Sequence, residues 1–448
     1  MKQRNPAKPE ADKDGIARLF NFLFGGLLGL SILKFGNVAI FESLVAYPEN
    51  GWEWVLNPWP VAIGYVLLLV MAVAGVTITR WQIRTPKWLL LMPLAWLLWQ
   101  FVAATQSVDS TLSRATLKHF ASCILCFYIG YFVVGQRQNP MSLLTGMIIA
   151  VALVVATGLE QHFGGLERTR HYFYTYLYPQ MTSVPPEYLK KMNSDRIWGT
   201  LFYPNSLAGV MLLLLPAVLA ACLQRFTRLT LGARQFVAAA FAAGGLACLY
   251  WSGSKGGWLL MLLLGLITLV HLPFGRRWKV LVVASVLVVG LAGFGLKYAG
   301  FFRRGATSVS ARFDYWSAAA KTALRNPIFG TGPGTFALSY EKIKRPESEM
   351  AKLTHNDYLQ QASDSGLLGM GTFSAFVLGI VSLGRPRPDS AVNDWLAFAI
   401  WLGLVGWWLQ GFLEFGLYIP ALAWPGFGLS GWLLANRGKP IDKVGLTI

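Results

Sequence analysis

The chain alternates between long apolar stretches and short polar connections. A helix needs about 20 largely apolar residues to cross the hydrocarbon core of a bilayer, and about twelve stretches approach this length. They lie near residues 16–33, 61–79, 88–104, 119–135, 141–160, 206–224, 235–251, 257–273, 280–298, 366–383, 394–411 and 417–435. The pattern predicts an all-α polytopic membrane protein with about 12 transmembrane helices.

The basic residues of the short connections fall on one side of the predicted membrane. With the N-terminus in the cytoplasm, the cytoplasmic connections and the C-terminal tail carry Arg80, Arg84, Lys87, Arg137, Arg225, Arg228, Arg234, Arg276, Arg277, Lys279, Arg385, Arg387, Arg437, Lys439 and Lys443. Cytoplasmic loops are enriched in lysine and arginine, and the reverse orientation would destroy this pattern. We therefore expect both termini in the cytoplasm and a first span that is retained, not a cleaved signal.

Composition agrees with this class of protein. Of the 448 residues, 54% are hydrophobic and only 13% are charged, which is more apolar than a soluble domain. A net charge of +18 would suggest a nucleic-acid partner in a soluble protein, but membrane topology accounts for about half of the basic residues. We expect membrane lipids as partners and no nucleic acid.

Two longer segments, residues 161–205 and 297–365, face outward in this topology. They divide the chain into residues 1–296 with nine transmembrane helices, a large outward loop at 297–365, and residues 366–448 with the last three helices and a cytoplasmic tail. The large loop is rich in basic residues, namely Arg303, Arg304, Arg312, Lys321, Arg325, Lys342, Lys344, Arg345 and Lys352. Long outward loops are exempt from the charge rule, so anionic ligands are the simplest explanation.

The large loop is predicted to be helical. Apolar residues recur at helical spacing from Ser308 to Arg325. Asn326 and Pro327, followed by three glycines, end that helix. A second short helix is expected over 335–344 and a third from Thr354.

His355 is the candidate general base. Thr354 and Asp357 stand three apart, as the N-cap and third residue of a capping box, which would place His355 and Asn356 in the first turn of the helix. Free N–H groups and the positive end of the dipole favour a neutral imidazole and attract anions there. A neutral histidine beside an anion can act as a general base. Alternatively, Thr354 and Asp357 only start a helix.

Three cations stand at the outward ends of predicted spans. Arg312 is four residues before Trp316, so its guanidinium is expected beside an aromatic ring. The alternative interpretation is that the Arg312 side chain extends to a lipid headgroup. Arg196 precedes Pro204 and Asn205, where Asn205 may equally cap the next helix. Lys255 lies in the short turn WSGSKGGW. The alternative interpretation is that it is an ordinary lysine of a turn without a ligand.

Cations and a histidine at the ends of spans suggest a site for a pyrophosphate at the membrane surface. Arginine binds phosphate oxygens bidentately, and fixed positive charge stabilises a departing diphosphate. The acidic residues Asp314, Glu341, Asp357 and Asp364 are scattered in the sequence. We therefore expect no metal site, no cofactor, and metal-independent chemistry.

Four motifs resemble the O-antigen ligase and O-antigen polymerase superfamily. They are RIWGTLFYPNSLAG at 196–209, SGSKGG at 252–257, RNPIFGTGPGTF at 325–336 and THNDYLQ at 354–360. Their order, with apolar spans between them and one large outward loop, carries the resemblance, which is best from about residue 196 to 375.

This resemblance implies a GT-C-like glycosyltransferase of the bacterial inner membrane with its active site facing the periplasm. The donor would be a glycan on undecaprenyl diphosphate, and the acceptor of the ligases is the lipid A core. By motif, His355 resembles the essential loop histidine, Arg312 the loop arginine before an aromatic residue, and Arg196 the arginine before the Pro-Asn element. Lys255 stands where arginine is more frequent, which puts a bidentate phosphate contact there in doubt.

The resulting prediction is an inverting O-antigen ligase. His355, Arg312 and Arg196 are the expected catalytic residues; Arg196, Arg312, Lys255 and Asn356 are expected to bind the donor diphosphate, with Thr354, Asp357, Tyr358, Trp316 and Asn205 in support. An O-antigen polymerase and a protein O-oligosaccharyltransferase are alternatives with the same chemistry. A non-enzymatic lipid-glycan transporter is a third, although transporters tend to place ionisable groups near the bilayer midplane.

Overall fold

The computed structural model describes residues 8–79, 81–136, 139–180, 189, 192–273, 275–303, 307–386 and 395–437. Several basic residues of the sequence analysis lie outside these ranges, namely Arg80, Arg137, Arg304, Arg387, Lys439 and Lys443, as do both chain ends. All regular secondary structure in the described ranges is helical, as the sequence predicted.

Nine helices of the described residues are long and apolar enough to cross a membrane. They are α1 (Lys8–Lys34), α3 (Val61–Ile78), α4 (Lys87–Ala104), α5 (Ser110–Tyr128), α6 (Met141–Glu160), α9 (Pro204–Arg225), α10 (Leu231–Trp251), α12 (Arg276–Arg303) and α15 (Asp357–Leu383), with α5 and α6 prolonged by further helical turns. Three shorter helices, α11 (Lys255–His271), α17 (Trp395–Gln410) and α18 (Pro420–Asn436), occupy the remaining predicted spans. The chain is thus an all-α polytopic membrane protein, as predicted.

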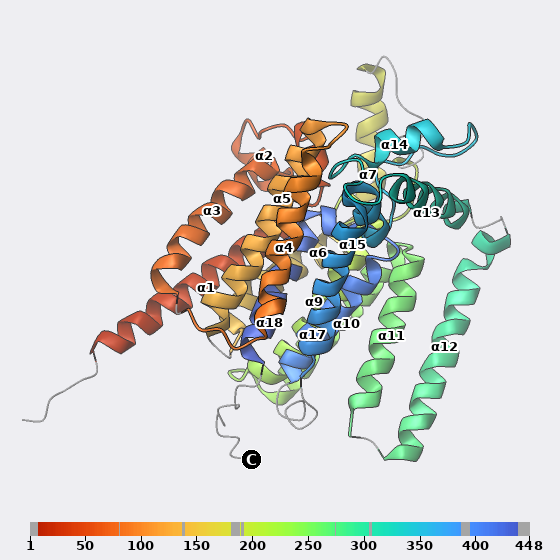
Figure 1. Ribbon diagram of the computed structural model, residues 1–448. Helices are drawn as coiled ribbons and strands as arrows, with labels where there is room; N and C mark the ends of the chain where they lie inside the picture. The colour runs from red at the N-terminus through yellow and green to blue at the C-terminus, as the bar shows by residue number, and fades with distance from the viewer. Residues whose placement is uncertain are drawn as a thin grey trace, which may run out of the picture.

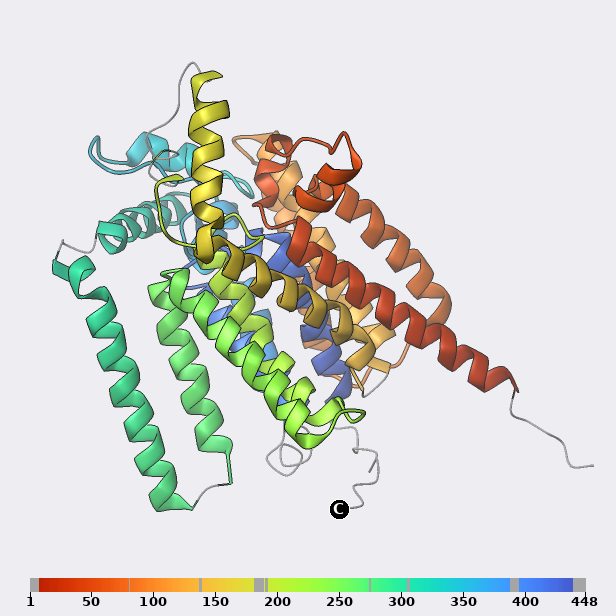
Figure 2. The ribbon, with the colours of Figure 1, turned by 180° about the vertical axis from the view of Figure 1, so that it is seen from behind.

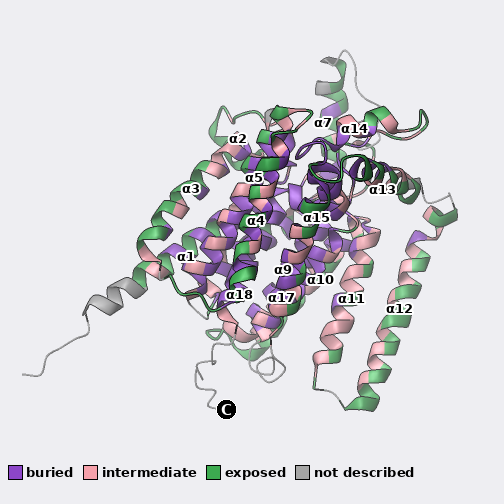
Figure 3. Ribbon diagram, in the orientation of Figure 1, coloured by how far each residue is buried: buried purple, intermediate pink, exposed green. Residues whose placement is uncertain are grey.

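Helix α9 lies at the centre of the bundle and packs against α6, α10, α17 and α18 (Figure 1). Every residue of α18 from Pro420 to Ala435 is buried, which is expected of a helix that is apolar all round and surrounded by protein. Helix α12 is equally apolar but peripheral: it packs against α11, and its apolar surface is largely exposed (Figure 3). Lipid would cover that surface.

Small residues allow some of these helices to approach closely. Helices α1 and α6 meet at Gly25 and Gly29 of one and Gly146 of the other. A Cβ atom at any of these positions would overlap the backbone of the opposite helix. Glycine contacts of this kind are characteristic of helix pairs in membranes, where van der Waals packing drives association.

One end of the bundle carries the short helices α2 (Gly51–Leu56), α7 (Leu166–Tyr172), α13 (Thr307–Arg325) and α14 (Phe336–Ile343) (Figure 1). We call this the α13 end. Helices α13 and α14 match the predicted helices over 308–325 and 335–344. The third helix of the loop, α15, begins at Asp357 and is kinked at Ser365–Gly366, the predicted boundary between the loop and the next span.

The glycine-rich passage between α13 and α14 is fixed to the start of α15. The amides of Gly332 and Gly334 donate to the backbone oxygen and the carboxylate of Asp364, each at 2.8 Å. Gly330 and Gly366 have positive φ, and a Cβ on either would overlap the opposing backbone. The motif GTGPGT therefore holds α13 against the helix that follows His355.

Candidate active site

Residues from distant parts of the chain converge at the α13 end. Arg196 lies in the loop before α9, Asn205 is the second residue of α9, Lys255 begins α11, Arg312 is on α13, His355 precedes α15, and Glu414 lies between α17 and α18. The structure thus places the predicted Arg196, Arg312 and His355 around a carboxylate that the sequence analysis did not select.

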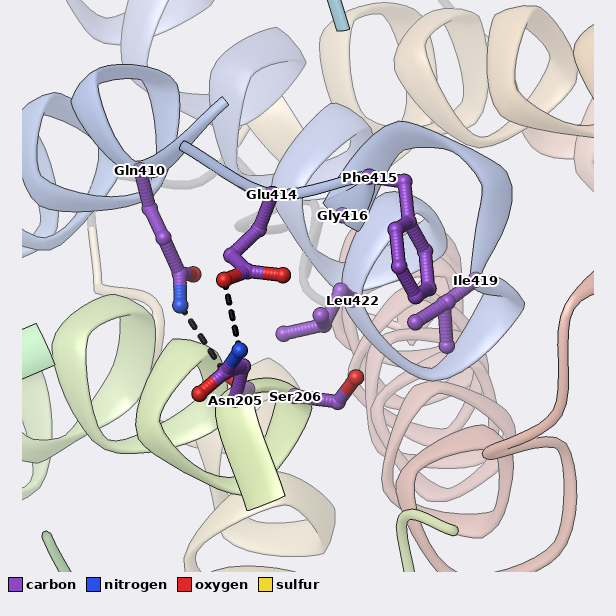
Figure 4. Close-up of a pocket in the computed structure, with 8 residues that line it drawn as sticks. All are labelled: Asn205, Ser206, Gln410, Glu414, Phe415, Gly416, Ile419 and Leu422. Carbon is purple, nitrogen blue, oxygen red and sulfur yellow. Dashed lines mark hydrogen bonds between the residues drawn. The ribbon is translucent and has the colours of Figure 1, made fainter. Parts of the chain in front are cut away.

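Glu414 joins these groups. Its Oε1 forms an ion pair with Nη2 of Arg312 and accepts a hydrogen bond from Nδ2 of Asn205 at 2.6 Å. Its Oε2 lies 3.0 Å from Nδ1 of His355. Figure 4 shows the Glu414 carboxylate and the bond from Asn205, in a small pocket that Gln410 and Phe415 also line. A single buried carboxylate therefore binds a cation, an amide and an imidazole.

Arg196 is attached to the same network through one intervening residue. Its Nη2 donates to Oδ1 of Asn205 at 2.8 Å, and its Nε donates to the backbone oxygen of Ser252 at 2.6 Å. Gly253, the next residue, has positive φ, and a Cβ there would lie 3.1 Å from Nε of Arg196. The alternative cap role of Asn205 is not observed, because its side chain bridges Arg196 and Glu414 and the N-cap of α9 is Tyr203.

The backbone of His355 adopts an unusual conformation. Its φ is +51°, a left-handed value that costs a non-glycine residue about 1–2 kcal/mol. The ring lies between Phe415, at 4.7 Å, and Tyr315, at 5.9 Å between centroids. Among the described residues no hydrogen-bond partner is observed for its Nε2, and the side chain is 30% exposed. Nδ1 is thus held by Glu414 while Nε2 is accessible.

The predicted capping box is wrong in its register. Asn356, not Thr354, is the N-cap of α15, because its Oδ1 accepts from the amide of Leu359 at 2.9 Å. The hydroxyl of Thr354 instead forms a local turn with both backbone groups of Asn356. His355 consequently precedes the helix and is not part of its first turn.

The other residues around His355 hold the start of α15 in place. Nδ2 of Asn356 donates to the backbone oxygen of Phe412 at 3.1 Å, so this amide positions the start of α15, and its predicted diphosphate contact stays a prediction. Oδ2 of Asp357 accepts from the amide of Leu417 at 3.1 Å. The hydroxyl of Tyr358 donates to the backbone oxygen of Trp408 at 3.0 Å. These three residues fix His355 against the turn that carries Glu414.

Cations outnumber acids around Glu414. Burial raises the pKa of this carboxyl, but Arg312, His355 and Arg196 outweigh that effect and hold its pKa below the ordinary value, so the group is ionised. Burial also lowers the pKa of the Arg196 guanidinium. Such a site favours a bound anion.

Two lysines complete the cation cluster. Nζ of Lys255 lies 3.8 Å from the ring centroid of Phe301 and 5.1 Å from that of Tyr298, both on α12. Nζ of Lys297, also on α12, lies 3.0 Å from the ring centroid of Tyr250. These three contacts are cation–π interactions, and they tie α12 to the site.

Two buried donors near the site lack partners. Nε of Arg312 and Nε1 of Trp316 make no hydrogen bond to any described residue, although buried N–H groups are nearly always paired. The ring of Trp316 packs on Phe313 at 5.6 Å. The described cation–π contacts do not include one between Arg312 and Trp316. These unpaired donors fit a ligand rich in acceptor oxygens.

In the part of the chain that the structure describes, no three His, Cys, Asp or Glu side chains gather as a metal site would require. Glu414 and Lys297 are the residues that the sequence analysis missed. The available signal was the isolated carboxylate of Glu414 within the apolar run LQGFLEFGLY. A charged residue in such a run is expensive unless it is paired and functional.

Comparisons with known proteins give one family match and one relative. Residues 237–374 match the family described as O-Antigen ligase. A Haemophilus influenzae protein described as uncharacterized is 29% identical over 157 residues, which cover 29% of this chain and 38% of that protein. The chain therefore spans less than half the length of that relative. The matched domain includes Lys255, Arg312 and His355. This match supports membership of the O-antigen ligase and polymerase superfamily.

Proposed function

We propose that this protein is an O-antigen ligase that transfers a glycan from undecaprenyl diphosphate to a lipid A-core acceptor. The observation that carries the proposal is the network in which Glu414 joins His355, Arg312 and, through Asn205, Arg196. It combines an oriented imidazole with two guanidinium groups, which is what glycosyl transfer from a diphosphate requires.

His355 acts as the general base. The ionised Glu414 accepts the Nδ1 proton, so Nε2 of the neutral imidazole carries a lone pair. Nε2 takes the proton of an acceptor sugar hydroxyl as that oxygen bonds to the anomeric carbon of the donor. The bond from the anomeric carbon to the diphosphate oxygen breaks, and the diphosphate leaves with the electron pair. Attack from the face opposite the leaving group inverts the anomeric centre.

Arg196 and Arg312 bind the diphosphate and stabilise the negative charge that develops on it. Arg312 offers the unpaired Nε, and guanidinium donors aimed at a developing anion are among the strongest catalytic contributions. Lys255 and Lys297 add positive charge from the neighbouring helices. These cations supply the stabilisation that a metal ion would otherwise provide, so the proposed reaction is metal-independent.

The proposed topology places the α13 end in the periplasm and both termini in the cytoplasm of a bacterial inner membrane. Residues 297–365 then form a periplasmic catalytic loop, residues 1–296 the first nine spans with a periplasmic segment at 161–205, and residues 366–448 the last three spans and tail. The network lies at the outer end of the bundle, where a diphosphate in the outer leaflet can reach it; a transporter would place such groups near the midplane.

Reconstitution tests this proposal. Wild-type protein in proteoliposomes should transfer glycan from undecaprenyl diphosphate to purified lipid A core, and His355→Ala should not. His271→Ala is the matched control, because His271 ends α11 at the opposite end of the bundle. Transfer that survives His355→Ala contradicts the proposed base. Elongation of lipid-linked glycan, or transfer to a periplasmic protein, without transfer to lipid A core assigns the chain to the polymerases or the protein O-oligosaccharyltransferases.

A further inference from the structure

Four exposed tyrosines cover the helix that rises from the outer end of α6. They are Tyr172, Tyr174, Tyr176 and Tyr178, with exposed fractions of 56%, 38%, 56% and 41%, and we call them the tyrosine surface. Their rings pair along the helix, Tyr172 with Tyr176 at 5.3 Å and Tyr174 with Tyr178 at 5.6 Å between centroids. Two aromatic stripes therefore run along this helix.

The tyrosine surface stands clear of the bundle. Helix α6 is interrupted at Phe163–Gly164, where the backbone leaves helical geometry. The chain then continues through α7 and the turns Phe173–Leu177 and Tyr178–Gln180 in a new direction, projecting past the other spans on the α13 end (Figure 2). These 15 residues extend about 22 Å at helical rise. The tyrosines thus lie beyond the ends of the neighbouring spans, not among them.

This helix is bonded directly to the segment that carries Arg196. Arg170 donates from Nε to the backbone oxygen of Met192 and from Nη2 to that of Ser194, each at 3.1 Å, and its Nη2 lies 2.5 Å from Oδ1 of Asp195. The hydroxyl of Tyr174 donates to Oδ1 of Asn193 at 3.0 Å. The tyrosine surface and the candidate diphosphate site are therefore joined by four consecutive residues, 192–195.

We propose that the tyrosine surface binds the glycan of the lipid-linked donor, an inference that rests on the proposed function. A donor whose diphosphate lies at Arg196 has a polysaccharide that must extend away from the membrane, and this helix extends from the same point. Sugar rings have an apolar C–H face and a hydroxyl edge, which complement the face and hydroxyl of tyrosine.

Lipid headgroups are the competing partner, since tyrosine is also enriched at membrane surfaces. The position of the helix beyond the spans disfavours them. The composition of the helix also disfavours them. Among the described side chains of residues 166–180, the large apolar residues Leu166 and Phe173 are buried, and polar residues such as Glu167, Arg168 and His171 are exposed beside the tyrosines. A headgroup contact would also leave aliphatic side chains facing the bilayer.

Glycan binding by the full chain in nanodiscs tests the proposal. The probe is polysaccharide released by mild acid from the lipopolysaccharide of the organism that encodes the chain, and every protein carries His355→Ala, so that binding is measured without transfer. The variant Tyr172→Leu with Tyr176→Leu keeps apolar bulk but removes both rings. It should bind the polysaccharide about 10-fold more weakly, because the two ring faces that contact the sugars are lost.

Two controls define the outcome. Tyr172→Phe with Tyr176→Phe keeps the rings and removes only the hydroxyls, so it should bind at least about 3-fold more tightly than the double leucine variant. Tyr47→Leu with Trp52→Leu changes two equally exposed aromatic residues elsewhere and should bind normally. If the double leucine variant fails to fold, the single changes should each weaken binding about 3-fold. Unchanged binding in the leucine variants overturns the tyrosine surface even where the transfer assay succeeds.

Discussion

Nδ1 of His355 and Oε2 of Glu414 lie 3.0 Å apart, although 59 residues separate them in the chain. The carboxylate also pairs with Arg312, on a third segment. The orientation of the imidazole is consequently set by a residue outside the loop that carries it. A substitution of Glu414 therefore tests the proposed mechanism as directly as a substitution of His355.

Glu414→Gln should lower the rate of glycan transfer by about 10²- to 10⁴-fold. The amide is nearly isosteric, but it offers an N–H group where the imidazole needs an acceptor and removes the charge that pairs with Arg312. Initial rates in proteoliposomes measure the effect. Asp314→Asn is the control, since Asp314 pairs with Arg345 on the loop surface and its change should leave the rate within about 2-fold. A Glu414→Gln protein with wild-type activity would exclude the proposed tautomer.

The Glu414 carboxyl should make stability depend on pH. Its pKa in the folded protein lies below the ordinary value of 4.5, so the ionised group stabilises the fold fully above pH 4.5, and this contribution disappears as the pH falls through the lowered pKa. The melting temperature of wild type should exceed that of Glu414→Gln at neutral pH, and the difference should shrink as the pH falls below 4.5. A difference that stays constant with pH would show that the carboxyl does not titrate in this way.

Arg196→Lys should reduce transfer by about 10- to 100-fold, mainly through weaker use of the donor. A lysine has one point of charge and cannot bond Ser252 and Asn205 simultaneously while facing a diphosphate. Rates measured across donor concentrations separate binding from turnover. Arg168→Lys, on an exposed ion pair with Glu160, is the matched change and should have little effect. Equal rates for the two variants would remove Arg196 from the site.

Gly366→Ala should destabilise the protein by more than about 2 kcal/mol. The residue has a φ of +71°, and its Cβ would overlap the backbone oxygen of Ile328. Gly371→Ala, five residues further along α15, has nothing within 4 Å of its Cβ and should be neutral or stabilising by about 0.5–1 kcal/mol. Thermal unfolding in detergent measures both. A tolerated Gly366→Ala would mean that the kink is not required.

Chelation should leave glycan transfer unchanged. The proposed reaction relies on Arg196 and Arg312 for charge stabilisation, so excess EDTA in the proteoliposome assay is expected to retain the full rate. A rate that falls with EDTA and recovers with added magnesium or manganese would contradict metal-independent chemistry.

The fold was predictable from sequence in its elements but not in its arrangement. Spans such as α12 and α18 were evident because a run of apolar residues satisfies its backbone polar groups only as a helix in lipid. The sequence did not show that lipid surrounds α12 whereas protein surrounds α18, because lipid tails and protein side chains are equally apolar. Hydropathy therefore located both helices without showing that α18 is buried and α12 peripheral.

The site was predictable in its cations and histidine but not in the residue that joins them. Arg196, Arg312 and His355 stand out as polar groups at the ends of spans. Glu414 gains its meaning only from contacts across the fold. The cap was misplaced for a similar reason: Thr354 and Asn356 are both good N-cap residues, and contacts of the α15 start with Gly411 and Phe412 select the second.

The order of synthesis gives the network a final consequence. Arg196, Asn205, Arg312 and His355 all precede Glu414 in the chain, and chains are made from the N-terminus. Until α17 has been inserted, Arg312 lacks its ion pair and His355 lacks the acceptor that fixes its tautomer. A partly synthesised chain could attract a lipid diphosphate but would have no oriented base. Under the proposed mechanism, catalytic competence therefore coincides with the insertion of the closing spans.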